Sequence, residues 1–218
     1  MRQVYIIIGV VMAAVLTGCD AHRDFPDTTM KVGHILCTDG KVMAYEDYEK
    51  SGKTAIAVVF HVSQGEDDGE GSGYAVYLWD IDPVAFADSI GVAQGTSADE
   101  NAYDGNSNTF ALYDTEETTS PLATAVFDLW RYGQSAYIPS VAEMRQLYNA
   151  KDIINPYIEK CGGTPIPDAA DDCWYWTSTE VEGQETAKAW LYSLGSGAMQ
   201  ETPKVQEHKA RPVVSLRL

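Results

Sequence analysis

Basic residues are scarce in this chain: 15 Lys and Arg stand against 32 Asp and Glu, a formal net charge of −17 over 218 residues. Such an excess of carboxylates repels phosphate backbones, so no nucleic-acid partner is expected. Adhesion to anionic lipid headgroups by charge is disfavoured for the same reason. A long hydrophobic run is missing too, because the apolar segment from Val4 to Leu16 is shorter than the ~20 residues that a spanning helix needs.

Cysteine is also scarce. None of the four Cys lies in a CxxC pair or at a Cys/His ligand spacing, which argues against a structural zinc site. Cys161 and Cys173 flank a Gly/Pro-rich loop and could close a disulfide, which would leave Cys37 buried and reduced. The alternative is three small buried residues with free thiols. The sequence leaves both possibilities open.

Recognisable catalytic motifs are missing as well. The four His, at positions 22, 34, 61 and 208, belong to no nucleophile arrangement, and a G-x-S-x-G motif does not occur. Carboxylates are abundant, but no spacing singles out a pair suited to glycoside hydrolysis. We therefore predict a protein that is not an enzyme. An enzyme acting on envelope or dietary polymers is the weaker alternative.

The first residues have the layout of a secretory signal: Arg2, a short apolar segment, and small residues before Cys19. The run Leu16-Thr17-Gly18-Cys19 resembles the lipobox of bacterial lipoproteins. In that family the Cys sulfur receives a diacylglyceryl group, and cleavage makes the Cys the first residue. The resemblance implies a signal peptide over residues 1–18, a lipidated tether over 19–31, and a membrane partner reached through the acyl chains.

The remaining 200 residues (218 less 18) are enough to bury a core, and 45% hydrophobic residues with 13 Tyr, 5 Trp and 5 Phe indicate a folded, aromatic-rich body. Asp39-Gly40 predicts a hairpin turn between short strands over 33–44. Apolar runs predict strands over 54–62 and 74–81, and long loops are expected over 83–119.

The second half begins with two punctuated helices. Ser120-Pro121 opens one that Gly133 ends, and Ser140 with Glu143 forms a capping-box pair at the start of the next. A further short helix is expected over 152–160, and strands over 174–179, 187–194 and 210–218. This order predicts an α+β fold with antiparallel sheets, two to three short helices and long loops.

Motifs between Ala136 and Val214 resemble the DUF1566-type family, related to the Lcl C-terminal domain. They are Tyr137-Ile138-Pro139-Ser140-x-x-Glu143-Met144-x-x-Leu147-Tyr148, Gly162-Gly163-Thr164-Pro165, Tyr175-Trp176-Thr177-Ser178-Thr179-Glu180, Ala189-Trp190 and Arg211-Pro212-Val213. The family is similar to C-type-lectin-like domains, and many members are lipoproteins of gut Bacteroidetes. The resemblance implies a C-type-lectin-like domain over 32–218, with an N-terminal β-hairpin region (32–82) and a core motif region (120–218).

Aromatic residues near the C-terminal end suggest a carbohydrate-binding face, because sugar C–H faces stack on flat rings. Alternation along a strand sends neighbours to opposite faces. If Trp176 and Trp190 fill the core, Tyr175 and Tyr192 point outward. The predicted ligand-binding residues are Tyr175, Glu180, Glu182, Gln184, Thr186 and Tyr192.

Asp104, Asn106 and Asn108 offer oxygen ligands at the alternate spacing of a calcium loop. Thr109 stands where that loop requires Gly, and Asx residues at this spacing more often cap turns. We therefore expect no metal or cofactor, with calcium at these three residues as the weaker alternative.

Together these patterns predict a lipid-anchored protein of the bacterial cell envelope, at the outer membrane or cell surface. Its expected role is a non-catalytic binding module for a glycan or protein ligand. The alternative is an accessory or tip subunit of a surface fibre or another envelope assembly.

Overall fold

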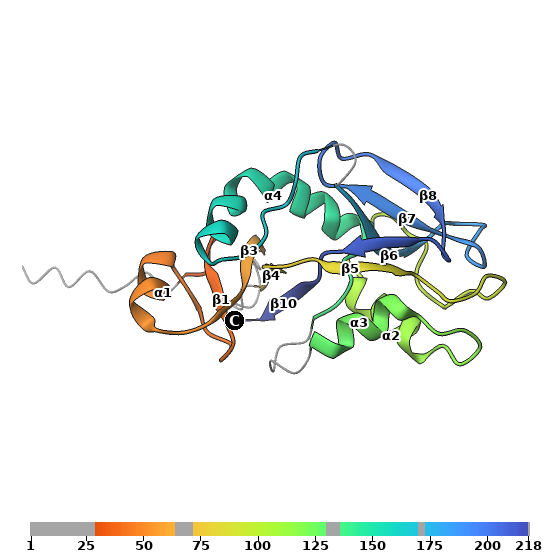
Figure 1. The fold of residues 1–218 in the computed structure, drawn as a ribbon, viewed down its shortest axis with the longest axis horizontal. Helices are drawn as coiled ribbons and strands as arrows, with labels where there is room; N and C mark the ends of the chain where they lie inside the picture. The colour runs from red at the N-terminus through yellow and green to blue at the C-terminus, as the bar shows by residue number, and fades with distance from the viewer. Residues whose placement is uncertain (1–28, 64–71, 130–135, 170–172, 218) are drawn as a thin grey trace, which may run out of the picture.

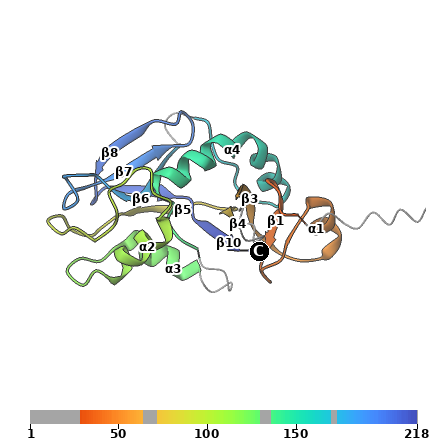
Figure 2. The same cartoon turned by 180° about the vertical axis from the view of Figure 1, so that it is seen from behind.

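The structure, a computed structural model, describes residues 29–63, 72–129, 136–169 and 173–217. The predicted signal peptide, Cys19 and most of the tether lie outside these residues. The described chain has the predicted α+β fold, with two five-stranded sheets and four helices. Figure 1 shows the strands between the long helix α4 (Val141–Lys160) on one side and the shorter α2 (Gly105–Asp114) and α3 (Pro121–Phe127) on the other, and Figure 2 shows the same layers from behind.

The first sheet is antiparallel throughout, in the order β10-β4-β3-β1-β2. The β1–β2 pair is the predicted hairpin, and Gly40 in its turn has a φ of 81°, a left-handed conformation that favours glycine. The predicted strand over 74–81 ends earlier, at Tyr77. The strands are β1 (Ile35–Cys37), β2 (Val42–Met43), β3 (Ala55–Ser63), β4 (Ser72–Tyr77) and β10 (Val213–Arg217).

The second sheet has the order β5-β9-β6-β7-β8 and is mixed, whereas antiparallel sheets were expected. β6 and β9 run parallel and pair at one register position, Tyr175 with Lys209. Their connection is long enough for this because β7 and β8 intervene. The strands are β5 (Ile81–Ala85), β6 (Trp174–Glu180), β7 (Lys188–Ser193), β8 (Met199–Pro203) and β9 (Glu207–Ala210).

Helices α3 and α4 begin where their capping residues predict. The Ser120 hydroxyl accepts a hydrogen bond from the Ala123 amide at 3.1 Å. In α4 the Glu143 carboxylate accepts from the Ser140 amide at 2.7 Å, and the Ser140 hydroxyl accepts in return from the Glu143 amide at 3.4 Å. These bonds satisfy amides that have no partner within the helix. α3 ends at Phe127, and the predicted end at Gly133 lies outside the described residues.

The expected separate helix over 152–160 is wrong, because α4 continues without a break for 20 residues. Pro156 lies inside it and cannot donate a hydrogen bond to the Asp152 carbonyl. Both residues are exposed, so water can satisfy this carbonyl. Helix α1 (Tyr45–Ser51) is short and has no buried residue.

Helix α2 and strand β5 overturn the expectation of long loops over 83–119. The α2 sequence is rich in Asn, Ser and Thr, which favour turns when considered locally. Tertiary hydrogen bonds hold it: the Asn108 side chain accepts from the Ser97 amide, and the Thr109 hydroxyl accepts from the Ile138 amide, both at 2.9 Å. Asn108, Thr109 and Leu112 are buried.

Two hydrophobic cores lie on the two sides of the strands. The α4 core lies beneath α4 and includes Val58, Phe60, Met144, Tyr175 and Tyr192. The α2–α3 core lies on the other side and includes Val59, Ala75, Leu112, Leu122 and Trp176. Each core takes side chains from both sheets, so the regions 32–82 and 120–218 fold against each other. Within the described ranges no helix is both long and apolar enough to span a bilayer.

Candidate functional site

The structure buries both tyrosines that were expected on a binding face. Tyr175 is 0% and Tyr192 is 3% exposed. The Tyr175 hydroxyl donates to Asp80 Oδ2 at 3.3 Å, and the Tyr192 ring meets Tyr148 of α4 with 6.4 Å between centroids. The outward orientation predicted for Tyr175 and Tyr192 is wrong, because both side chains pack in the core beneath α4. Alternation therefore sends Tyr175 and Tyr192 into the α4 core, while Trp176 enters the other core.

Glu180 is buried as well, and its predicted role at a binding face is wrong. Its carboxylate forms an ion pair with the Lys204 ammonium, and the two side chains are 1% and 0% exposed. The same carboxylate accepts from the Gln94 amide and the Thr96 hydroxyl, each at 2.9 Å. These contacts join the chain before α2 and the residue that follows β8 to the end of β6, so Glu180 has a structural role.

Glu182, Gln184 and Thr186 lie in the connection between β6 and β7, with Glu182 and Thr186 exposed. The Gln184 side-chain amide donates to Glu201 at 3.0 Å. Glu182 lines an acidic depression of about 400 Å³ together with Ala98, Asp99 and Glu185. Three carboxylates line it, but they are not arranged as a group that could hold a metal ion.

The calcium interpretation of Asp104, Asn106 and Asn108 fits the structure poorly, because Asn106 and Asn108 lie within helix α2. The Asn108 amide donates to Asp104 Oδ1 at 2.8 Å, and the Asn106 side chain is exposed. Their oxygens therefore do not converge as the ligands of a calcium loop do. Within the described residues no group of three or more His, Cys, Asp or Glu could hold a metal ion.

The structure contains no bond between Cys161 and Cys173: both are free thiols, as is Cys37. The Cys173 sulfur lies 3.0 Å from the Ser193 hydroxyl. Cys161 follows α4, where burial and the neighbouring Cys37 raise its thiol pKa to about 11. The proposed pair is thus separated, with Cys161 facing Cys37 and Cys173 facing β7.

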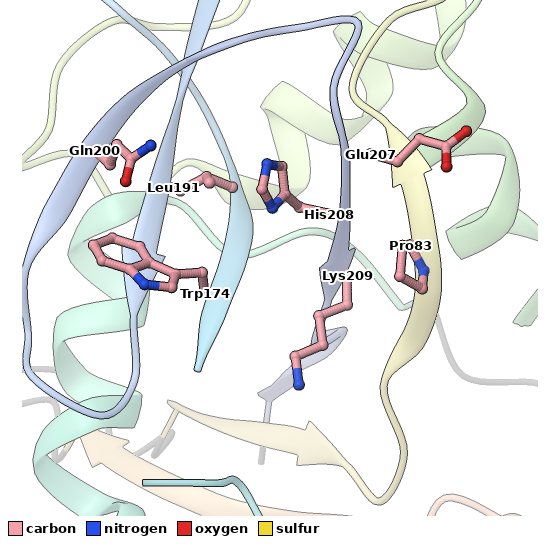
Figure 3. Close-up of a pocket in the computed structure, with 7 residues that line it drawn as sticks. All are labelled: Pro83, Trp174, Leu191, Gln200, Glu207, His208 and Lys209. Atoms are coloured by element: carbon pink, nitrogen blue, oxygen red, sulfur yellow. The ribbon is translucent and has the colours of Figure 1, made fainter. Parts of the chain in front are cut away.

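The strongest candidate site is a pocket of about 240 Å³ in the second sheet, named here the Trp174 pocket. Its lining residues come from all five strands of that sheet: Pro83, Trp174, Leu191, Gln200, Glu207, His208 and Lys209. It opens next to the single pairing position of β6 and β9. On the N-terminal side of this position the two strands do not pair, and Figure 3 shows His208 of β9 pointing toward Leu191 and Gln200 across the opening.

Aromatic contacts fix the inner wall of the Trp174 pocket. The buried Trp176 indole donates to the Val84 carbonyl at 3.0 Å, which joins β6 to β5 across β9. The His208 ring meets this indole edge to face, with 5.3 Å between centroids and an interplanar angle of 89°. Burial lowers the His208 pKa below its ordinary value, so the imidazole is neutral at pH 7 and both donates and accepts.

Four side chains of the pocket have unused hydrogen-bonding groups. In the described part of the chain, the Trp174 indole N–H, the Gln200 amide, the Glu207 carboxylate and the His208 imidazole have no hydrogen-bond partner. Lys209 differs, because its ammonium lies 3.5 Å from Asp80 and 4.7 Å from the Tyr175 ring centroid. Figure 3 shows its side chain directed away from His208.

A second pocket, of about 280 Å³, is mostly apolar and is lined by Thr38, Thr54, Ala55, Ile56, Tyr77, Trp79 and Leu129. Ligand sites usually combine an apolar wall with a few convergent polar groups. The Trp174 pocket has this combination, whereas no charged or amide side chain lines the second pocket among the described residues.

Sequence reasoning found Trp174 only as a member of an aromatic cluster, and it missed Pro83, Glu207 and His208. Glu207, His208 and Lys209 lie in β9, and no predicted strand covered these three residues. A four-residue strand with three polar residues has no hydrophobic alternation to detect. Its pairing with β5 and β6 is settled by tertiary contacts.

Comparison of the chain with known protein families, with curated protein sequences and with solved structures finds no match in any of the three. The resemblance to C-type-lectin-like lipoproteins therefore stays a prediction.

Proposed function

We propose that this protein is an envelope-anchored lipoprotein whose folded domain is a non-catalytic glycan-binding module, with a sugar ring held in the Trp174 pocket. The observation that carries the proposal is the partly exposed Trp174 indole, with the side chains of Gln200 and His208 beside it in the pocket. A C-type-lectin-like scaffold and a lipid on Cys19 belong to the same proposal, and they rest on the sequence motifs.

The chemistry of the pocket suits a sugar. An indole offers a flat apolar surface for the C–H face of a pyranose ring. Gln200 and His208 each both donate and accept hydrogen bonds, so they can bind the hydroxyl groups of the ring. A volume of about 240 Å³ lies just below the ~300–1,000 Å³ of typical ligand pockets, which favours a single ring.

The pocket's chemistry favours binding over hydrolysis. Among its described lining residues Glu207 is the one carboxylate, whereas most glycosidases use two carboxyl groups about 5–9.5 Å apart. His208 contacts Trp176 and no Ser or Cys nucleophile lines the pocket beside it. Hydrolysis by the usual mechanism would need a second carboxylate, whereas binding needs none.

The pocket also suits presentation away from an anchored end. Figure 1 shows α1 and β1 at one end of the long axis, and β7 and β8 at the other. The first described residues belong to the α1 end, where Gly33 packs against Tyr157 near the end of α4. A tether leaving this end would hold the second sheet, and with it the Trp174 pocket, on the side far from the membrane.

A glycan array tests the proposal directly. The sample is the chain from Asp20 to Leu218, which keeps every described residue. We expect a reproducible hit whose affinity falls at least about tenfold, or ~1.4 kcal/mol, in Trp174→Ala. The matched control is Trp79→Ala, which removes a half-exposed indole outside this pocket and leaves binding unchanged. An array without hits on folded protein would remove the glycan role in favour of protein recognition or fibre assembly. A hit that Trp174→Ala binds equally well would remove the assignment of the site to the Trp174 pocket.

A further inference from the structure

Helices α2 and α3 carry a cluster of aromatic rings at the surface, named here the Tyr113 patch: Phe110, Tyr113 and Phe127. The Phe127 ring meets the Tyr113 ring with 4.3 Å between centroids and the Phe110 ring with 5.4 Å. Tyr113 is 56% and Phe110 is 47% exposed. Both helices form the layer opposite α4, as Figure 1 shows. Clustered apolar rings on an outer surface are typical of an interaction site.

Helix α2 packs into the fold through its other face. The buried residues of this helix are Gly105, Asn108, Thr109 and Leu112. Tyr113 and Asp114 follow Phe110 by three and four residues, so helical periodicity places all three together on the outer face. Among the described residues, neither the Tyr113 hydroxyl nor the Asp114 carboxylate has a hydrogen-bond or ion-pair partner. Both groups are therefore available to a partner.

Negative charge gathers at the Tyr113 patch. Between Lys53 and Arg131 the sequence has 14 Asp and Glu but no Lys or Arg, and Arg131 lies outside the described residues. Asp114 lies in the last turn of α2, where the helix carbonyls already carry partial negative charge and a carboxylate is unfavourable. The residue that caps the end of α3 is the exposed Asp128.

The two helix ends meet at the rings. Tyr113 and Phe127 belong to the last turns of α2 and α3, and neither last turn contains a basic residue. The faces of aromatic rings are also negative. Carboxylates, helix ends and ring faces thus act in the same direction, and the charge complementary to them is a cation.

We propose that the Tyr113 patch docks a basic segment of a partner protein, in which an Arg or Lys side chain lies beside apolar side chains. The cation would pack on the Tyr113 ring and donate a charge-assisted hydrogen bond to the Asp114 carboxylate. The apolar neighbours would pack on Phe110. An anionic lipid surface would be repelled by the same charges. The Trp174 pocket takes no part in this contact, so the proposal is independent of the glycan role.

Fluorescence anisotropy tests the proposal with two labelled synthetic peptides. In the first peptide Arg alternates with Leu, and in the second the uncharged citrulline replaces every Arg. Each peptide is titrated at pH 7 and physiological salt with the chain from Asp20 to Leu218. We expect the arginine peptide to bind at least about tenfold more tightly, because only its side chains can pair with a carboxylate.

Three variants locate the binding. Asp114→Lys should weaken binding of the arginine peptide at least about tenfold while slightly raising the thermal midpoint, because a cation is favourable at a helix C-terminus. These opposite effects separate loss of binding from loss of folding. Tyr113→Ser should weaken binding about fivefold through loss of the ring. The matched control is Glu182→Lys, the same reversal at an exposed residue outside the patch, which should keep binding within about twofold.

Equal losses in Asp114→Lys and Glu182→Lys would show that net charge alone attracts the peptide, and the proposed surface would be wrong. Equal binding of the two peptides, or no binding to folded protein, would also overturn it. If sedimentation velocity showed self-association that Tyr113→Ser abolishes, the patch would belong to a second copy of the chain instead. None of these results bears on glycan binding, which Trp174→Ala tests separately.

Discussion

The Lys204 ammonium and the Glu180 carboxylate face each other with almost no contact with water. Desolvation lowers the Lys204 pKa, although its charged partner opposes this shift. The ammonium also donates to the Val92 carbonyl at 3.2 Å. A buried charge is costly unless it is paired and hydrogen-bonded, so these contacts must remain together. From the sequence, Glu180 was predicted to lie at the surface. Its ion-pair partner is 24 residues away, and no nearby residue indicates it.

Breaking this ion pair from one side should be strongly destabilising. Lys204→Met leaves the Glu180 carboxylate buried without a cation, and we expect the free energy of unfolding to fall by about 3–5 kcal/mol in urea titrations. The double change Glu180→Gln with Lys204→Met should cost much less than the sum of the single changes.

The matched control for that experiment is the partly exposed pair Lys188–Glu201, with side chains 33% and 40% exposed. Lys188→Met should change stability by no more than about 1 kcal/mol, because water solvates the carboxylate that remains. If Lys204→Met and Lys188→Met lowered the free energy of unfolding equally, burial would not determine the loss of stability.

At the scale of the element, the first turn of α4 combines a capping box with an unusual carboxyl group. Glu143 is 1% exposed, and burial raises its pKa to about 7. It accepts from the Tyr137 hydroxyl at 3.1 Å, and the neighbouring Asp104 carboxylate opposes its ionisation. At mildly acidic pH, the Glu143 carboxyl in the first turn of α4 therefore holds a proton in the folded state and releases it in the unfolded state.

This difference predicts a pH dependence of stability. Below pH 4.5, the ordinary pKa of Glu, Glu143 is protonated in both states. Between 4.5 and about 7 the folded state holds an extra proton, so stability falls by ~1.4 kcal/mol per pH unit, or about 3 kcal/mol in all. Urea titrations from pH 4 to 8 should show that Glu143→Gln lacks this loss, so that its stability relative to the original chain rises with pH. Parallel curves for the two proteins would contradict it.

Residues within one turn of sequence predicted where the helices begin. They did not predict which face of each strand is buried. Ser120, Ser140 and Glu143 act within one turn of sequence, so their capping roles were predictable. Tyr175 and Trp176 are adjacent residues of opposite orientation, and both are fully buried. Alternation identifies two faces, yet it does not tell which face a distant helix will cover.

At the scale of the whole molecule, the formal charge of −17 opposes folding through self-repulsion. Raising sodium chloride from low to physiological ionic strength should therefore increase the thermal midpoint by a few degrees, because salt screens this repulsion. Differential scanning calorimetry at pH 7 measures the shift. Potassium chloride should act identically, since the effect requires no specific ion.

The same experiment with calcium chloride at matched ionic strength tests whether Asp104, Asn106 and Asn108 bind calcium. Since the Asp104 carboxylate binds Asn108, and Asn106 lies on a helix, we expect calcium and magnesium to shift the midpoint equally. A rise specific to calcium, lost in Asp104→Asn, would restore the calcium interpretation of this segment.

The sequence by itself determined the features that depend on composition or on neighbours within a few residues. These are the α+β class, the hairpin at Gly40, and the starts of α3 and α4. It also supplies the lipobox-like run that ends at Cys19, which lies outside the described residues.

Only the tertiary structure decided which polar residues converge. Pro83, Trp174 and His208 lie far apart in the chain and meet because the second sheet places β9 between β5 and β6. The same packing buried Glu180 and Tyr192, which the sequence had assigned to a binding face. Pairing of distant strands and coverage by helices depend on contacts across the whole fold, and no local pattern of residue types encodes them.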